Sequence, residues 1–191
     1  MKSRKFSQRL FLAVELPRFA REHLVQGRKL WRKQMDADFR WVPPLNLHLT
    51  LRFLGELEVA KSKALSKSLD ALGQATSPFQ LSLGKIYAFP SAQEAKGLSL
   101  EVEPSSELSE LLKSIEGHCK RLQIPRDKKP FQSQITLARS AEPQIVAPLK
   151  APKDLRGFMV RNFTLFEGRL AQNGPTYHAL RKFDLRKALE S

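Results

Sequence analysis

Two short tracts of the sequence could bring polar side chains together for chemistry on an anion. The first, residues 47–52, reads Leu-His-Leu-Thr-Leu-Arg, and the second, residues 133–138, reads Ser-Gln-Ile-Thr-Leu-Ala. Each follows a loop that contains proline, and each places a threonine two residues after a polar residue, His48 or Gln134. These two positions are 86 residues apart, close to half of the chain, which indicates two similar halves related by a pseudo-twofold axis.

The first tract gains a polar face if it forms a strand. Residues two apart then project to the same side, so we expect His48, Thr50 and Arg52 to point together, with the leucines and Phe53 buried opposite. Arginine binds phosphate through parallel hydrogen bonds, and threonine adds a neutral donor. The tract therefore predicts a strand that holds a phosphate next to a group able to carry a proton.

The second tract has a simpler polar face, made of Gln134 and Thr136, with Ile135 and Leu137 buried. A single histidine on a half-exposed strand is most often a surface residue, and threonine is an ordinary strand former. Strand formation does not require threonine and leucine at matching offsets twice, however. The repetition favours a cleft between two lobes that binds an anion.

Composition narrows the class of partner. The 191 residues carry 33 Lys and Arg against 19 Asp and Glu, a formal net charge of +14. A protein this basic commonly binds RNA or DNA, and a generic basic surface that favours solubility is the alternative. The single cysteine, Cys119, excludes an intramolecular disulfide framework and a Cys-rich zinc site. No apolar run approaches the roughly 18 residues of a membrane span.

The start of the chain resembles a secretory signal only in its basic residues. The apolar run from Leu10 to Val14 is short and is followed by Glu15 and Pro17. Such a run lacks the length and the cleavage site of a signal peptide. We therefore expect a cytoplasmic protein, without a membrane partner.

Hydrophobic periodicity predicts the elements that position the two tracts. We expect helices at about 18–34, 58–72 and 106–122, the last capped by Ser105 or Ser106. We expect strands over residues 9–16, 47–54, 79–89, 97–103, 134–138, 159–165 and 177–185. Few strand–helix–strand units follow one another, which favours an α+β fold with mainly antiparallel sheets.

The tract Asn46–Glu56 resembles a motif of a known family. Together with residues 9–13, 40–42, 89–91, 130–131, 135–139, 163–170 and 177 it is similar to the two-histidine (2H) phosphoesterases, specifically the RNA 2′,3′-cyclic phosphodiesterases, also called 2′–5′ RNA ligases. The resemblance implies one bilobal domain over residues 1–191, with motif 1 at 48–51 and a degenerate motif 2 at 134–137. Each lobe would be an antiparallel sheet backed by helices, facing a central cleft.

The resemblance also implies roles for single residues. His48 would donate a proton to the leaving ribose oxygen, and Thr50 and Thr136 would hold phosphate oxygens. Gln134 occupies the position of the family's proton acceptor, a histidine. The chemistry needs no metal or other cofactor, the substrates would be RNA termini or 2′,3′-cyclic nucleotides, and we expect a monomer.

Two further residues are candidates for contact with the substrate. Arg139 matches the family after the second motif, although strict alternation points it away from Gln134, and a structural ion pair is its alternative role. Phe131 could stack on a base, as aromatic side chains in basic grooves do, with core packing as the alternative. Trp41 has the same two alternatives.

The glutamine at position 134 leaves the activity open. An amide does not titrate near neutrality, although it still donates hydrogen bonds, and loss of one general base typically costs about 10² to 10⁴ in rate. Three interpretations compete: a slow hydrolase, a non-catalytic binder of RNA ends or nucleotides, and an enzyme whose base comes from elsewhere, with His178 as the one spare histidine considered. A basic RNA-associated structural protein with a vestigial groove is a further alternative.

Overall fold

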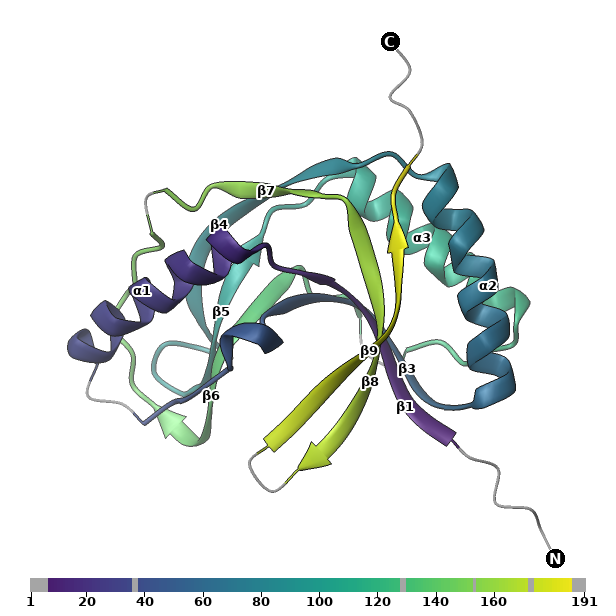
Figure 1. Ribbon diagram of the computed structural model, residues 1–191. Helices are drawn as coiled ribbons and strands as arrows, with labels where there is room; N and C mark the ends of the chain where they lie inside the picture. Colours follow the sequence, from purple (N-terminus) through teal and green to yellow (C-terminus); the bar gives the residue numbers. More distant parts are fainter. Residues whose placement is uncertain (1–6, 36–37, 128–129, 153, 172–173, 187–191) are drawn as a thin grey trace, which may run out of the picture.

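The computed structural model describes residues 7–35, 38–127, 130–152, 154–171 and 174–186, which form one curved sheet with three helices (Figure 1). The helices are α1 (Arg18–Gln34), α2 (Val59–Ala75) and α3 (Ser106–Arg121), with a 3-10 turn, η1 (Pro44–Asn46). The strands are β1 (Ser7–Glu15), β2 (Arg40–Trp41), β3 (His48–Glu58), β4 (Phe79–Phe89), β5 (Ala95–Val102), β6 (Gln134–Gln144), β7 (Gly157–Val160), β8 (Asn162–Ala171) and β9 (Gly174–Asp184).

The sheet runs in the order β7-β4-β5-β6-β3-β1-β8-β9, with β2 paired to β6. Its paired strands are antiparallel, which confirms the predicted α+β class. The prediction gave each lobe its own sheet, whereas the structure joins the two halves into one sheet where Leu49 of β3 pairs with Ile135 of β6. The two tracts therefore lie side by side at the middle of the sheet.

The leucine-rich face of the sheet forms the core with the helices. Helix α3 buries Leu108, Leu111, Ile115 and Cys119, the stripe that its periodicity predicts. Its first turn is capped by Ser105, whose Oγ accepts the backbone N–H of Leu108 at 3.1 Å. Helix α2 contacts α3, β3 at the middle of the sheet and β9 at its edge, on the side opposite the polar faces.

Helix α1 packs on the β6 half of the sheet through two tryptophans. The rings of Trp31 and Trp41 stack with their centroids 6.0 Å apart, and the indole N–H of Trp31 donates to the carbonyl of Lys150 at 3.0 Å. Arg28 lies over the Trp41 ring. Trp41 thus packs against the core, which is one of the two roles that the sequence allowed for it.

The single late strand predicted over residues 159–165 is wrong. The structure has two strands there, β7 and β8, separated at Arg161. β7 pairs with β4, whereas β8 pairs with β1 and β9. The buried positions change phase at the break, from Phe158 and Val160 to Phe163 and Leu165, which a search for one alternating run overlooks.

Among the described residues, no helix is long and apolar enough to cross a membrane.

Candidate active site

The strand that carries the first tract contains a bulge. Ala13 of β1 pairs with Thr50, and the preceding residue of β1, Leu12, pairs with Arg52, so Leu51 is an extra residue in β3. After an extra residue, each later side chain of the strand points to the face opposite the one that strict alternation predicts. Both Leu51 and Arg52 are consequently buried, while Phe53 is 55% exposed. The expectation that Arg52 projects beside His48 and Thr50, with Phe53 buried, is wrong for this reason.

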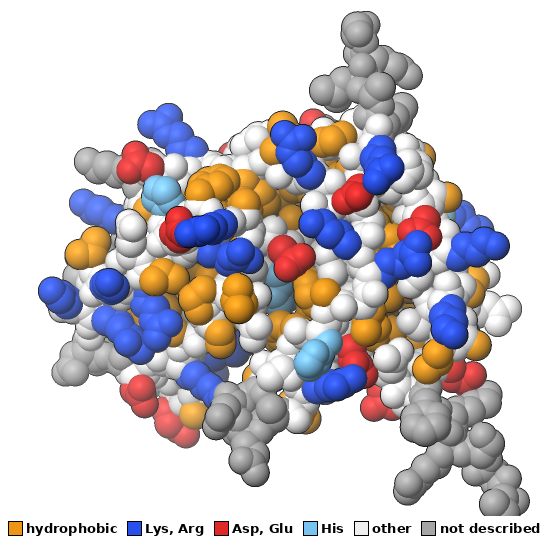
Figure 2. Space-filling view, viewed as in Figure 1, with side chains coloured by type: hydrophobic (Ala, Val, Ile, Leu, Met, Phe, Trp, Pro, Cys, Tyr) orange, Lys and Arg blue, Asp and Glu red, His pale blue; other side chains and the backbone are white. Residues whose placement is uncertain are grey.

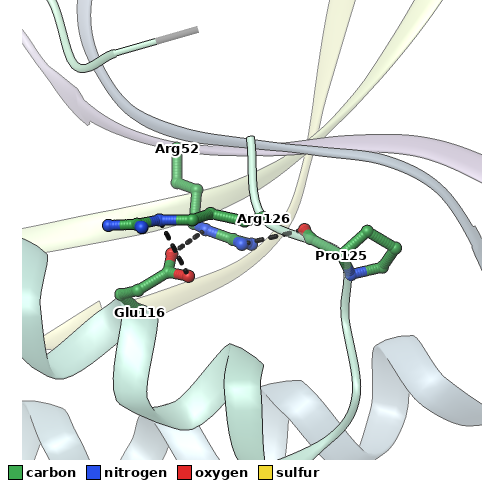
Figure 3. Close-up of polar contacts among 4 residues, drawn as sticks. All are labelled: Arg52, Glu116, Pro125 and Arg126. Atoms are coloured by element: carbon green, nitrogen blue, oxygen red, sulfur yellow. Dashed lines mark hydrogen bonds and ion pairs between the residues drawn. The ribbon is translucent and has the colours of Figure 1, made fainter. Parts of the chain in front are cut away.

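Arg52 instead joins β3 to α3 and the loop that follows it (Figure 3). Its Nε donates to Oε2 of Glu116 at 2.7 Å, and its Nη2 donates to the carbonyl of Pro125 at 2.9 Å. Arg126 lies 3.9 Å from the other oxygen of Glu116. The guanidinium is thus used inside the fold and faces away from the polar side of the sheet.

The second tract contains a matching bulge. Ser99 of β5 pairs with Thr136 and its neighbour Leu98 pairs with Ala138, so Leu137 is the extra residue of β6. Leu137 and Ala138 are both buried, and Arg139 becomes exposed. The prediction from strict alternation, that Arg139 points away from Gln134, is therefore wrong. The two bulges occupy corresponding positions in the two tracts, so the tracts are similar in backbone conformation as well as in sequence.

Arg139 lies over the polar face of the sheet. Its guanidinium is 5.7 Å from the centroid of the Phe89 ring. Burial raises the pKa of the Tyr177 hydroxyl, and the positive charge of Arg139 partly offsets this rise. The Tyr177 ring itself lies edge-on to His48, with the centroids 5.3 Å apart.

The pair Leu49 and Ile135 brings the two polar faces together. Both side chains are fully buried. Their neighbours along each strand point to the opposite side. His48 and Thr50 of β3 therefore lie on the same face of the sheet as Gln134 and Thr136 of β6, all at half-buried positions.

His48 is held in one tautomer by its hydrogen bonds. The ring Nδ1 lies 2.7 Å from the carbonyl oxygen of Asn46, which can only accept, so Nδ1 carries the hydrogen. The ring Nε2 lies 3.0 Å from Oγ1 of Thr50 and, in the neutral ring, accepts its hydroxyl hydrogen. Burial lowers the pKa of His48, and the Asn46 carbonyl and the Glu15 carboxylate oppose the shift.

Aromatic rings surround the histidine and form one wall of a pocket of about 310 Å³. The ring of Phe11 lies 5.2 Å from that of His48, centroid to centroid, and stacks on Phe166 at 5.3 Å. Glu15 and Arg21 also line the pocket. Sequence reasoning missed these residues. Two signals were available: Phe11 and Phe166 lie in segments that resemble the family, and the unbroken apolar run of β1 is typical of a strand covered on both faces.

Gln134 has a partner on a more distant strand. The hydroxyl of Tyr87 on β4 donates a hydrogen bond to Oε1 of the Gln134 carboxamide. Glu101 of β5 pairs with Gln134 in the register, on the same face. Burial raises the pKa of Tyr87, and the charge of Glu101 raises it further. The phenol is thus a hydrogen-bond donor at neutral pH.

The remaining candidates lie at the margin of this face or away from it. Phe131 is 38% exposed in the segment before β6, which argues against the core-packing role. His178 lies on β9 between Tyr177 and Ala179, which both line the pocket, so its side chain projects from the opposite face. His178 therefore does not take the place of a base at position 134.

Lys and Arg predominate among the charged side chains on the side of the molecule that Figure 2 shows. Lys and Arg side chains gather there on both sides of a central area of apolar side chains, over α1 and over α2 and β9. Within the described part of the chain, no group of three or more His, Cys, Asp or Glu side chains could hold a metal ion.

Comparison with known proteins gives consistent matches. A family model described as LigT like phosphoesterase matches residues 14–99. The RNA 2′,3′-cyclic phosphodiesterase of Thermus thermophilus is 36% identical over 193 residues, which cover 93% of this chain and 90% of that protein. The protein of the same name from Escherichia coli is 30% identical over 178 residues, covering 93% and 97%.

A solved structure has the same fold. The crystal structure of Escherichia coli LigT in complex with 3′-AMP matches with a TM-score of 0.78 and 29% identity, covering 95% of this chain and all of that one. The residues matched by the family model include His48 and Thr50 and end before the second tract.

Proposed function

This chain belongs to the LigT-like phosphoesterase family, and from that premise we propose that it hydrolyses RNA ends that carry a 2′,3′-cyclic phosphate, leaving a 2′-phosphate. The observation that carries the proposal is the shared face of the sheet, on which His48 and Thr50 lie beside Gln134 and Thr136. Relatives at 30% and 36% identity, named as RNA 2′,3′-cyclic phosphodiesterases, support the same activity.

In the proposed reaction, the oxygen of a water molecule forms a bond to phosphorus in line with the bond to the ribose 3′-oxygen, which breaks. The protonated His48 gives its Nε2 proton to the departing oxygen, and the proton of the water passes to solvent. The Nε2 atom suits this role because Nδ1 is fixed on the Asn46 carbonyl and Nε2 faces the side of Thr50. The hydroxyls of Thr50 and Thr136 hold phosphate oxygens.

The phosphate receives further support from Arg139, which the bulge at Leu137 turns onto this face. Phe131, exposed before β6, is proposed to stack on a base. Arg52 has no contact with substrate in this proposal, since its guanidinium is committed to Glu116 and Pro125. The net charge of +14 favours RNA over a neutral substrate.

We propose that residues 1–191 act as one two-lobed unit, as a cytoplasmic monomer that needs no metal. The continuous sheet supports the single unit, because both polar faces belong to it. The acid, the threonines and the amide account for the reaction with protein groups alone.

A non-catalytic binder of nucleotides or RNA ends is the second candidate. The observation in its favour is Gln134, whose carboxamide cannot take a proton from water and whose oxygen is already bonded to Tyr87. In this case the polar face of the sheet binds the phosphate without hydrolysing it. Because one missing base costs about 10² to 10⁴ in rate, the hydrolase would be slow rather than inactive.

The experiment is to incubate the purified protein with 2′,3′-cyclic AMP and identify the product by chromatography. Formation of 2′-AMP that the substitution His48→Ala abolishes supports the hydrolase. Binding of the cyclic nucleotide by calorimetry without any product supports the binder. Absence of both binding and product in the folded wild-type protein refutes the two candidates together.

A further inference from the structure

The side chain of Tyr87 reaches across a neighbouring strand to the second tract. In the register, Tyr87 of β4 pairs with Ser99 of β5, and Ser99 pairs with Thr136 of β6. These side chains therefore share one face of the sheet, and Gln134 lies diagonally beyond Ser99. The phenol hydroxyl spans this distance and donates to Oε1 of Gln134.

This bond decides which end of the carboxamide is available. A glutamine side chain has an oxygen that only accepts and an NH₂ group that only donates. With the oxygen bonded to Tyr87, the NH₂ group is the end left for a ligand. Among the residues that the structure describes, no hydrogen bond involves Nε2 of Gln134, although Oε1 has its partner.

We propose that Tyr87 is a positioning residue, which holds the Gln134 carboxamide with its NH₂ group available to a ligand on the sheet face that also carries His48, so that this half of the site donates hydrogen bonds to a phosphate. The proposal rests on the proposed function, since it concerns how the same sheet face receives the phosphate of a nucleotide end. It assigns to Tyr87 and Gln134 together the binding of phosphate oxygens rather than the activation of water.

The phenol keeps the proton that this hydrogen bond requires. Burial and the negative charge of Glu101 raise the pKa of Tyr87, so the hydroxyl keeps its proton. If the carboxamide turned over, its carbonyl oxygen would face a negatively charged phosphate and repel it. Fixing the amide in this orientation therefore favours binding of an anion without a charged side chain at this position.

The consequence is an effect of Tyr87 that depends on Gln134. Without the phenol, the amide is free to turn, and we expect Tyr87→Phe to weaken binding of 2′-AMP by roughly 3- to 10-fold, the range for loss of one neutral hydrogen bond. In a protein that already carries Gln134→Ala, the same change should have no effect on binding. A merely structural role of Tyr87 would weaken binding equally in both backgrounds.

The test is a double-mutant cycle on the full chain, with 2′-AMP titrated by calorimetry into the wild type, Tyr87→Phe, Gln134→Ala and the double variant. Thermal melting of each protein shows that it is folded. Coupling of 3-fold or more between the two substitutions supports the proposal. Wild-type binding with no coupling overturns it and leaves the proposed function standing, whereas no binding by the folded wild type overturns both.

A second measurement is independent of any Tyr87 variant. The side-chain NH₂ resonances of Gln134 are assigned by NMR through their loss in Gln134→Ala, and 2′-AMP is added to the labelled wild type. Large shifts of these resonances at saturation support the donor role. Unchanged resonances on binding of 2′-AMP contradict it.

Discussion

Leu49 of β3 pairs with Ile135 of β6, and this is the single residue pair in the register between the two strands among the described residues. The two side chains are fully buried, so the polar neighbours on each strand lie on the opposite face of the sheet. Residues 86 positions apart, His48 and Gln134, thereby lie on one face of neighbouring strands.

The first prediction concerns the stability that Arg52 provides. Its buried guanidinium donates hydrogen bonds to Glu116 and to the Pro125 carbonyl, and a hydrogen bond that involves a charged group contributes about 1.5 to 3 kcal/mol. We expect Arg52→Ala to lower the free energy of unfolding by about that amount in urea denaturation, while the affinity of the folded protein for 2′-AMP stays within about twofold. Glu116→Gln is the matched control. It should cost less, because the glutamine keeps an oxygen that can accept the hydrogen bond from Nε of Arg52. Unchanged stability with a large loss of affinity would place Arg52 in the binding site.

The second prediction is a pH dependence set by His48. The acid must be protonated, and burial lowers its pKa from the ordinary value of about 6.5. The value of kcat/KM for 2′,3′-cyclic AMP should therefore fall as the pH rises, with a midpoint below the ordinary pKa of histidine. Glu15→Gln removes a charge that raises this pKa and should move the midpoint to lower pH, whereas the exposed Glu56→Gln should not. A rate that rises with pH through this range would make His48 a base.

The third prediction tests the bulge in β6. Arg139 faces the site, and a hydrogen bond to a charged group contributes about 1.5 to 3 kcal/mol. Arg139→Ala should thus weaken binding of a single-stranded RNA that ends in a 2′-phosphate by roughly 10-fold or more, and should reduce the slope of log Kd against log salt by about 0.7. Arg186→Ala is the control, since Arg186 is paired with Asp184 beyond β9. Equal effects of the two substitutions would mean that Arg139 acts only through the general charge.

Sequence reasoning predicted the parts of the fold that depend on local pattern. The apolar stripe of α3 and the alternation of β4 each depend on a single segment of the sequence, and the helix and the strand form where these patterns indicate. The repeat around His48 and Gln134 also predicted that the polar faces of the two tracts lie together. In the structure the tracts are neighbouring strands at the middle of one sheet, and their polar side chains lie on the same face.

The orientation of Arg52 and Arg139 could not be predicted in the same way. A bulge arises from pairing with the neighbouring strand, and nothing in the tracts themselves marks Leu51 or Leu137 as the extra residue. The aromatic wall around His48 is similarly a tertiary feature, since Phe11 comes from β1 near the start of the chain, whereas Phe166 and Tyr177 come from the consecutive strands β8 and β9 near its end.

The central claim is that His48 and position 134 act on the two sides of one cyclic phosphate. The most direct measurement is the rate of 2′-AMP formation from 2′,3′-cyclic AMP by the wild type, Gln134→His, His48→Ala and the protein with both substitutions. A histidine at position 134 supplies the missing base, so we expect Gln134→His to raise kcat by about 10² or more. The gain should disappear in the protein that also carries His48→Ala. A folded Gln134→His protein that binds the cyclic nucleotide with no gain in rate, or a gain that persists without His48, would contradict the claim.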